Sequence, residues 1–429
     1  MNKIMLFISC IIGTMLEWYD FAVFGLLAPV LAKIFFPFTS HINALLISFL
    51  IFATGFAMRP IGGIFFGHIG DKYGRKKAIV PAVMLMTIAT VCIGLLPEKA
   101  NYFTVAALVF CRLAQGFAVS GEYSGVLTLI SEQTTPRKSF FYQGFVEIGV
   151  MMGFLLGSLV AKFALSHTFN FIASWRIPFL VSFILCFFGL YLRLQINETK
   201  PDHRITQKNK IPIKILFSKK YFKTVIFGIL YIMGGTVEFY FISIYLPSYF
   251  HYIFKTKDYL NIPLIFSIIH IIFIPIFSYI TIYINILYLI IFYLTLYIIL
   301  PLLLIIIFIS HKPLSIYSII IALCVAHSLG KLLCNSLIVV LFPIKIRYTA
   351  SAFISNISVC LFGGTTPFIC WLIIKITGWH AAPAIYASFT ALISLVAVIC
   401  YKSKILAVIN IDEDKTQELN INKNVILGE

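Results

Sequence analysis

Residues 13–25 read GTMLEWYDFAVFG and place two carboxylates, Glu17 and Asp20, within an apolar segment that runs from about Ile4 to Ala32. About 20 apolar residues suffice for a helix to cross a bilayer, so this segment is predicted to span a membrane. Carboxylates at that depth are costly, and they usually face a cavity or a partner. Because Glu17 and Asp20 are three residues apart, they share one helix face. The stretch predicts a membrane protein with an acidic site inside its first span. The alternative is a buried ion pair that holds helices together.

The composition of the 429-residue chain extends this interpretation to the whole molecule. Hydrophobic residues make up 60% of it and charged residues 11%, against about 45–50% and about 25% in typical soluble domains. The apolar runs are continuous rather than alternating, which favours helices over the strands of a membrane barrel. The chain is therefore predicted to be an all-α polytopic membrane protein. We expect no cleavable signal peptide, because no small-residue cleavage site follows a short apolar core.

Twelve apolar runs of spanning length follow one another along the chain. The predicted spans are 4–32, 42–66, 78–96, 104–129, 142–165, 175–195, 223–249, 261–282, 286–309, 314–341, 349–375 and 382–401. The longest polar stretch divides them six and six, which fits a two-bundle transporter with its site between the halves. The predicted units are an N-terminal six-helix bundle (1–196), a cytoplasmic central loop (197–222), a C-terminal six-helix bundle (223–401) and a cytoplasmic tail (402–429).

Small residues predict how some of these helices pack and bend. Gly149, Gly153 and Gly157 recur at every fourth position, a seam that lets helix backbones approach closely. The pair Gly363-Gly364, followed by Pro367, predicts a kink or break in the eleventh span. These features inform the fold rather than the chemistry.

The net charge of +17 does not indicate nucleic-acid binding, because of where the basic residues lie. They cluster in alternate loops, at 72–77, 137–138, 193–223, 345–347 and 402–404. By the positive-inside rule, both termini and the central loop are predicted to be cytoplasmic. The 9 cysteines are scattered without a CxxC pair, so we expect no disulfide framework, no metal site and no cofactor.

The loop after the second span carries a specific pattern, RPIGGIFFGHIGDKYGRKK at 59–77. Asp71 can pair with the basic cluster that follows it or lie against a helix N-terminus, and either contact would lock two helices in one state. The alternative is a simple topology anchor. The spacing Gly-x-x-x-Asp-x-x-Gly-Arg-x-Lys resembles the signature of the major facilitator superfamily. The resemblance assigns gating to Arg59, Asp71, Arg75 and Lys77.

Further motifs narrow the resemblance to the metabolite:proton symporter family, and within it to bacterial proline/betaine transporters. They are GTMLEWYDF at 13–21, RPIGGIFFG at 59–67, RLAQGFAVSGEYSG at 112–125, SWRIPF at 174–179, LPSYF at 246–250 and FPIKIRYTASAFISNIS at 342–358. The likeness runs from about residue 10 to about residue 400. It implies a monomeric importer in the bacterial inner membrane that uses the proton gradient to import a small zwitterion, such as proline or glycine betaine, by alternating access.

The fourth span supplies a second group of polar residues. Arg112, Gln115 and Tyr123 share one helix face, and Glu122 lies beside it. An arginine at membrane depth needs a carboxylate partner or an anionic ligand. We expect Arg112 to face Glu17 or Asp20 across an empty cavity and to receive the substrate carboxylate. The alternative is a static packing pair.

Aromatic residues of the first span could complete the substrate site. A quaternary ammonium held over Trp18, Tyr19 and Phe24 would gain about 0.5–2 kcal/mol per ring. Tyr123 and Gln115 would add polar contacts.

Proton coupling is assigned first to Glu17 and Asp20, with Glu122 as a further candidate. Glu147 ranks below them because it lies near the cytoplasmic start of its span, where a long side chain can reach the surface. His270 and His327 are possible relays, although a lone histidine in a span is more often a structural, hydrogen-bonded residue.

The second half carries two charges within its spans, Glu238 in the seventh and Lys331 in the tenth. Each is costly alone, so we expect them to form an intramembrane pair beside the substrate. The family's charged loop between spans eight and nine is absent here, since residues 277–289 carry no charge. This departure puts symmetric gating in doubt.

Other functions remain open on the sequence. Extra positive charge from Arg112 and Lys331 would favour an organic-acid or dicarboxylate symporter, and the uncharged loop keeps a non-transporting or degenerate sensor in consideration. Exchange without protons is a further alternative. An enzyme is not expected, because no HExxH, GxSxG, phosphate-loop or Cys/His metal pattern occurs.

Overall fold

The computed structural model describes residues 3–73, 75–99, 101–120, 122–134, 136–169, 171–194, 215–254, 257–310 and 313–408. Within these ranges the ordered elements are all helical. Ten helical segments are long and apolar enough to cross a membrane, and two shorter apolar helices, Val80–Leu95 and Ser174–Phe187, accompany them. The predicted all-α architecture with twelve spans is confirmed.

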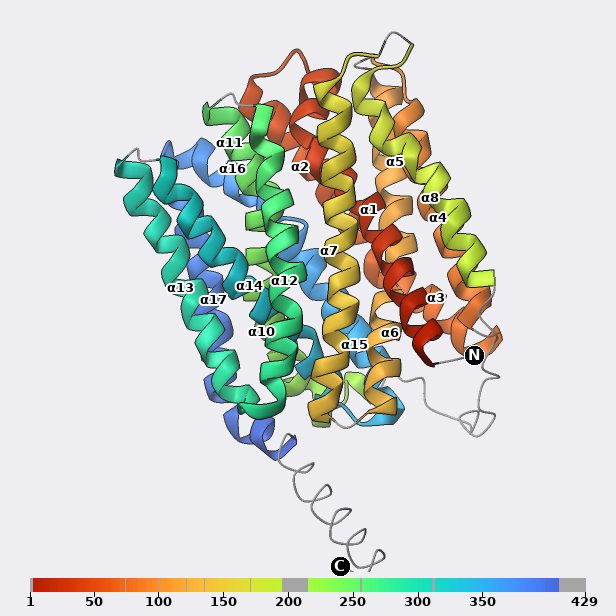
Figure 1. Cartoon of the computed structure of the whole chain (residues 1–429), viewed down its shortest axis with the longest axis vertical. Coiled ribbons are helices and arrows are strands. Elements are labelled where there is room, and N and C mark those ends of the chain that lie inside the picture. The colour runs from red at the N-terminus through yellow and green to blue at the C-terminus, as the bar shows by residue number, and fades with distance from the viewer. Residues whose placement is uncertain are drawn as a thin grey trace, which may run out of the picture.

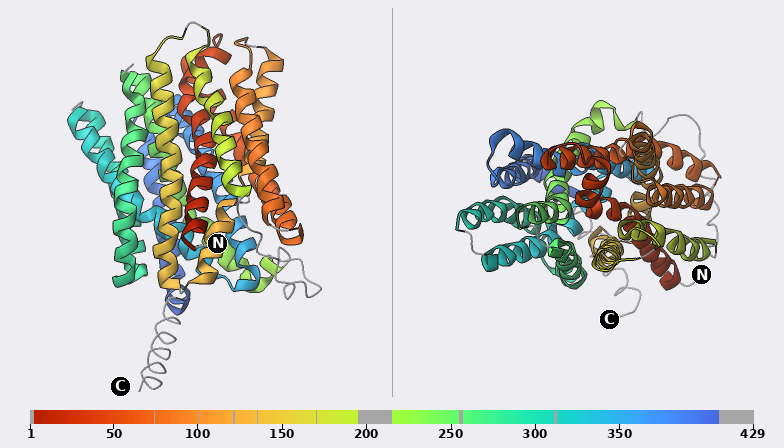
Figure 2. Two further views of the ribbon diagram at one scale, coloured as in Figure 1. Left: turned by 45° about the vertical axis from the view of Figure 1, so that its right-hand side comes forward. Right: turned by 90° about the horizontal axis from the view of Figure 1, so that it is seen from above.

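The first half of the chain forms one group of helices and the second half forms another beside it (Figures 1 and 2). The first comprises α1 (Lys3–Phe35), α2 (His41–Ala57), α3 (Arg59–Tyr73), α4 (Arg75–Leu95), α5 (Tyr102–Val119), α6 (Glu122–Gln133), α7 (Pro136–Ser166), η1 (Ser174–Arg176) and α8 (Ile177–Leu194). The second comprises α10 (Lys219–Tyr240), η3 (Phe241–Tyr245), α11 (Leu246–Phe254), η4 (Lys257–Leu260), α12 (Asn261–Tyr283), α13 (Ile286–Ser310), α14 (Pro313–Leu341), α15 (Ile344–Ser358), η5 (Val359–Gly363), α16 (Thr366–Thr377) and α17 (Ala382–Cys400). Helix α1 begins and α17 ends at the lower end of the molecule in Figure 1.

Four spans are interrupted near the middle of the molecule. The second breaks between α2 and α3 at Met58, and the fourth breaks between α5 and α6 after Ser120. The seventh and eleventh each contain a π-helical turn, η3 and η5. The predicted break at Gly363-Gly364 is confirmed by η5. Irregular backbone at membrane depth is tolerated where it lines a protein cavity rather than lipid.

The glycine seam packs α7 against α1, as the sequence predicts. A Cβ atom on Gly149 would lie 2.7 Å from the carbonyl oxygen of Ile11, and one on Gly153 would meet the carbonyl oxygen of Met15. A Cβ on Gly157 would make only ordinary contacts, the nearest at 3.6 Å. The first two glycines therefore set the distance between the two helices.

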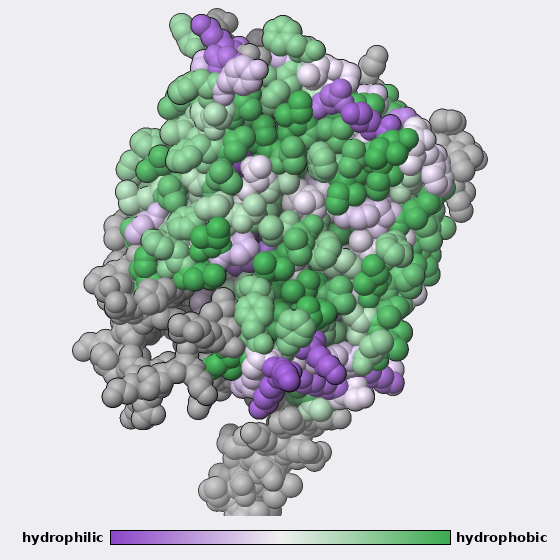
Figure 3. Space-filling model, turned by 180° about the vertical axis from the view of Figure 1, so that it is seen from behind, coloured by the Kyte–Doolittle hydropathy of each residue, from purple (hydrophilic) through white to green (hydrophobic). Residues whose placement is uncertain are grey.

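The outer surface is apolar around the middle and polar toward both ends (Figure 3). Large hydrophobic side chains such as Ile88, Phe187, Ile272 and Phe292 lie more than half exposed on it. Buried polar and charged side chains are instead gathered inside. This distribution suits a protein surrounded by lipid with a polar interior.

Candidate functional site

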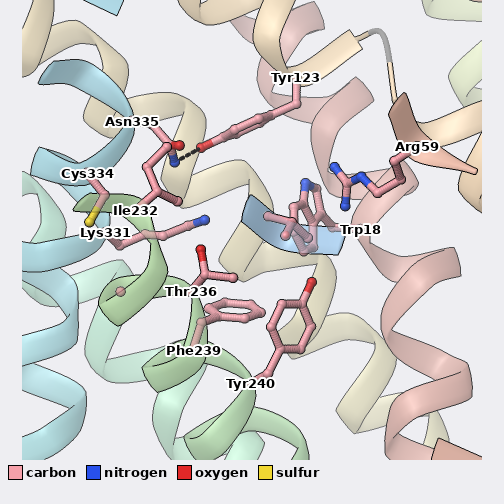
Figure 4. Close-up of a pocket in the computed structure, with 12 residues that line it drawn as sticks. Trp18, Arg59, Tyr123, Ile232, Thr236, Phe239, Tyr240, Lys331, Cys334 and Asn335 are labelled. Atoms are coloured by element: carbon pink, nitrogen blue, oxygen red, sulfur yellow. Dashed lines mark hydrogen bonds between the residues drawn. The ribbon is translucent and has the colours of Figure 1, made fainter. Parts of the chain in front are cut away.

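A cavity of about 40 Å³ lies between the two halves. Trp18 of α1, Arg59 of α3 and Tyr123 of α6 line it from the first half (Figure 4). The second half contributes Ile232, Gly235, Thr236, Phe239, Tyr240, Lys331, Cys334, Asn335 and Val359. Val359, the first residue of η5, and Tyr240, the residue before η3, are thus part of its wall. Small-molecule pockets usually hold about 300–1,000 Å³, so this cavity must widen before a solute can enter.

An ion pair connects the halves at this cavity. The Nζ atom of Lys331 in α14 lies 3.6 Å from Oε2 of Glu147 in α7, and both side chains are largely buried. Tyr123 donates its hydroxyl hydrogen to Oε1 of Glu147. Asn335 donates to the Tyr123 hydroxyl at 2.8 Å (Figure 4). The predicted pairing of Lys331 with Glu238 is wrong, because α7 supplies the carboxylate instead.

The Lys331 ammonium also lies among aromatic rings. Its distances to the ring centroids are 5.2 Å for Phe239 and 5.6 Å for both Trp18 and Tyr123. A cation within about 6 Å of a ring face is attracted by the ring quadrupole. The cavity wall therefore already holds a cation by aromatic contact.

Arg59 brings a second cation to the same cavity. Its Nε donates to Oδ1 of Asn356 at 3.1 Å, while its buried Nη1 has no hydrogen-bond partner among the described residues. The Arg59 guanidinium lies within electrostatic range of Glu17 and Tyr240. A buried guanidinium with an unused donor is suited to receive an anionic group.

Arg112 lies elsewhere, and the expectation that it faces Glu17 or Asp20 is wrong. Its Nη1 donates to Gln115 and its Nη2 to the Phe52 carbonyl, both at 2.9 Å. Its guanidinium lies 4.5 Å from the ring centroid of Phe24 and 4.8 Å from that of Phe21. Gln115 donates onward to Thr90 at 2.8 Å. Arg112, Gln115 and Phe24 thus form a packing network inside the first half and do not line the central cavity.

The two carboxylates of α1 line a different cavity, of about 30 Å³, inside the first half. Glu17 and Asp20 share it with Ser182 of α8 and Thr87 of α4. Glu17 is 9% exposed and Asp20 is 5% exposed. Since Trp18 faces the central cavity, α1 separates the acidic pair from the aromatic wall rather than placing them together.

The remaining predicted residues fall into two groups. Tyr19 donates to the Pro178 carbonyl at 2.6 Å and joins α1 to α8. Glu122 begins α6, Asp71 lies near the end of α3, and Arg75 and Lys77 lie in the first turn of α4. The side chains of these four residues lie outside the described part of the structure, so their assigned roles stay predictions.

A model of the Major Facilitator Superfamily matches residues 10–367. The chain belongs to this superfamily. Proline/betaine transporters of Escherichia coli K12 and Salmonella typhimurium are 29% and 30% identical to it over 91% of this chain and 82% of their own. A glycine betaine/proline/ectoine/pipecolic acid transporter of Dickeya dadantii, OusA, is 29% identical over 90% of this chain and 80% of its own. The solved structure of the E. coli xylose transporter XylE in a partially occluded inward-open conformation matches with a TM-score of 0.74 and 17% identity, covering 93% of this chain and 97% of that one.

Membership of the Major Facilitator Superfamily makes the chain a multi-pass membrane transporter of small molecules. The superfamily is not one of enzymes. Within this fold, the central cavity has the place that a substrate site between two bundles requires. The cavity region also contains Glu147, which the sequence pattern ranks low as a candidate. It further contains Tyr240 and Asn335, which the sequence pattern does not single out. The signal that could have identified Asn335 is its position four residues after Lys331 in an apolar span, which places both on one helix face.

Proposed function

We propose that this superfamily member is a proton-coupled symporter that imports a small zwitterion such as proline or glycine betaine. The observation that carries the proposal is the charge arrangement of the central cavity. Lys331 is matched by Glu147, while Arg59 retains an unused donor. The cavity thus offers one cation for a carboxylate and several aromatic faces for an ammonium group. The names of the relatives support the same substrate class.

The carboxylate end of the solute would bind Arg59. A guanidinium forms two parallel, charge-assisted hydrogen bonds to a carboxylate, which a neutral donor cannot match. Asn356 fixes the Arg59 side chain through Nε, and the buried Nη1 has no hydrogen-bond partner among the described residues. Desolvation inside the cavity would strengthen this contact further.

The ammonium end would bind the rings of Trp18, Phe239 and Tyr240. Trp18 and Phe239 already surround the Lys331 ammonium, so Lys331 stands where a substrate cation would lie. An entering ammonium group would displace Lys331 toward Glu147, its ion-pair partner. A quaternary ammonium suits these rings because it needs no hydrogen-bond acceptor.

Proton coupling would follow from competition for Arg59. The Glu17 carboxylate lies within electrostatic range of Arg59. A substrate carboxylate at Arg59 would replace that interaction and favour the protonated form of Glu17. Favourable coupling between two ligands is reciprocal, so the proton would likewise favour the solute. Asp20, in the same cavity, would accept or pass on the proton.

The transporter would operate as a monomer in the bacterial inner membrane, with both termini in the cytoplasm. The alternating distribution of basic loops supports this orientation. The proton gradient would supply the driving force, and no cofactor is needed.

A dicarboxylate is the second candidate substrate. Arg59 and Lys331 both line the central cavity, and a dicarboxylate could bind both if Glu147 were protonated. The two proposals differ in which solute binds the purified protein.

Equilibrium binding to protein in lipid nanodiscs separates these candidates. We expect glycine betaine and proline to bind, whereas choline, which lacks the carboxylate, and 2-oxoglutarate bind at least about tenfold more weakly. Arg59→Gln should weaken betaine binding by at least about tenfold, since each 1.4 kcal/mol is a factor of ten. Lys375→Gln, at an exposed lysine on α16, is the control. Tighter binding of 2-oxoglutarate would favour the dicarboxylate, and no binding of any solute by folded protein would favour a non-transporting relative.

A further inference from the structure

Two histidines meet inside the second half, next to the central cavity. The Nε2 atom of His270 in α12 lies 2.8 Å from Nδ1 of His327 in α14. The other nitrogen of His270 lies 2.7 Å from the Phe266 carbonyl oxygen, and that of His327 lies 3.2 Å from the Gly235 carbonyl oxygen. Both side chains are fully buried. All four ring nitrogens are therefore engaged.

The number of hydrogens in these contacts exceeds what two neutral rings carry. A carbonyl oxygen only accepts, so the contacts to Phe266 and Gly235 each require an N–H on the ring. A neutral imidazole has one N–H and one lone pair. If two neutral rings each donate to their carbonyl oxygen, Nε2 of His270 and Nδ1 of His327 both lack a hydrogen. Their lone pairs then face each other across 2.8 Å. One additional proton converts this repulsion into an N–H···N hydrogen bond.

We propose that His270 and His327 together bind one extra proton, held between Nε2 of His270 and Nδ1 of His327. The pair is then a cation with three hydrogen bonds for three N–H groups. It is a second proton-binding site, in the half of the molecule opposite to Glu17 and Asp20.

We assign the balancing negative charge to Glu238 of α10. It is 1% exposed, and neither of its carboxylate oxygens has a hydrogen-bond partner among the described residues. It lies within electrostatic range of Tyr297 on α13 and Cys324 on α14. The Tyr297 ring stacks on His327 with centroids 5.9 Å apart. The charged form of a buried carboxylate is strongly unfavourable, so such a group needs either a positive partner or a proton of its own.

The surrounding charges balance when the region holds one more proton, either on the histidine pair or on Glu238 itself, and the contacts of the ring nitrogens favour the histidines. Glu147 faces the region from α7 and Lys331 from α14, and these two pair with each other. Glu238 is left without a fixed cation in the described structure, because Lys331 is occupied. A protonated histidine pair restores neutrality to the group of two carboxylates and one lysine.

The proton site adjoins the substrate site. Gly235, whose carbonyl accepts from His327, and Phe239, whose ring lies 5.6 Å from that of His327, both line the central cavity. His327 and Lys331 lie one helical turn apart on α14. A role in coupling solute to protons rests on the proposed function, but the binding of the proton itself does not.

Nitrogen NMR of the full-length protein in nanodiscs, labelled with 15N-histidine, tests the proposal without any transport. The nine histidines are assigned with His270→Gln and His327→Gln, and the exposed His167 provides an internal reference. We expect the pair at neutral pH to show a nitrogen-to-nitrogen hydrogen bond and two further protonated nitrogens. Glu238→Gln should abolish the extra proton, whereas Glu238→Asp should keep it.

Two results would overturn the proposal. The first is two neutral rings in the unmodified protein, each with one unprotonated nitrogen. This would occur if His327 donated to His270 and made no hydrogen bond to the Gly235 carbonyl. The second is an unchanged cationic pair in Glu238→Gln, which would remove Glu238 as counter-ion. Proton-driven uptake in liposomes reports separately on the proposed function, so either claim can fail while the other stands.

Discussion

Lys331 illustrates how a charge is retained within a membrane-spanning helix. Its ammonium lies 3.6 Å from the Glu147 carboxylate and close to the rings of Trp18, Tyr123 and Phe239. Removing one partner of a buried ion pair leaves an uncompensated charge, which costs about 3–5 kcal/mol, whereas removing both is often tolerated.

The Lys331–Glu147 pair yields a stability prediction. Glu147→Gln alone and Lys331→Gln alone should each lower the thermal unfolding midpoint in detergent by several degrees, and the double variant should regain most of the loss. Glu98→Gln serves as the matched control, because the Glu98–Arg176 pair is partly exposed and such pairs contribute about 1 kcal/mol or less. Additive losses in the double variant would show that the two charges do not compensate each other.

Asp20 yields a prediction about coupling. It is buried in the cavity inside the first half, away from the proposed solute-binding residues. Asp20→Asn should therefore abolish gradient-driven accumulation while leaving solute exchange between equal concentrations within about threefold of normal. Both are measured in the same liposomes with labelled solute. Full accumulation by this variant would remove Asp20 from the coupling mechanism.

The sequence indicates which residues line the site better than it indicates which residues they contact. Trp18, Tyr123 and Lys331 line the central cavity as expected for substrate-binding residues. Arg112 was misplaced because two oxygens bind its Nη atoms and aromatic rings surround its guanidinium without a carboxylate, which leaves only Nε without a hydrogen-bond partner among the described residues. Glu147 was undervalued because the neighbour that buries it, Lys331, comes from a helix nearly two hundred residues later. Such pairings depend on how helices are rotated against each other, which one sequence does not specify.

At the scale of helices, the contact between α7 and α1 depends on individual glycines. Gly153→Ala should destabilise the protein by about 1–3 kcal/mol, the usual cost of overpacking, because its Cβ would meet the α1 backbone. Gly157→Ala, four residues along the same face, is the control, since its Cβ has room. Thermal unfolding of the two variants side by side measures the difference. Equal stability would show that the seam can relax.

The spans were predictable because membrane thickness fixes the length of an apolar helix. The turn between α12 and α13 lies where the predicted spans 261–282 and 286–309 meet, and the π-helical η5 lies at the predicted glycine pair. The π-helical η3 was not predicted, because its residues, Phe241–Tyr245, include neither glycine nor proline. Its geometry follows from packing around the cavity rather than from local propensity.

For the molecule as a whole, polar contacts join the two halves toward both ends. Toward the end where α1 begins, Asn356 of α15 accepts from Arg59 and donates to the Ser120 carbonyl at 3.1 Å. At the opposite end, Lys162 donates to Asn261 at 2.6 Å. In alternating access, the contacts at one end must break while the contacts at the other end stay intact.

Asn356→Ala should loosen the end where α1 begins. Hydrogen exchange followed by mass spectrometry should show faster exchange in α6 and α15, by about tenfold for the loss of about 1.4 kcal/mol, with α11 and α16 unchanged or slower. Asn261→Ala, which removes the contact at the other end, should give the reverse pattern. Uniformly faster exchange in both variants would indicate general destabilisation instead of a shift between two states.

The most direct test of proton-coupled zwitterion import is uptake of labelled glycine betaine by the purified protein in liposomes, with and without an inward proton gradient. We expect accumulation above the external concentration only when the gradient is present, and its loss when an ionophore collapses the gradient. Accumulation that ignores the gradient, or uptake of 2-oxoglutarate in place of betaine, would contradict the proposed coupling or the proposed substrate.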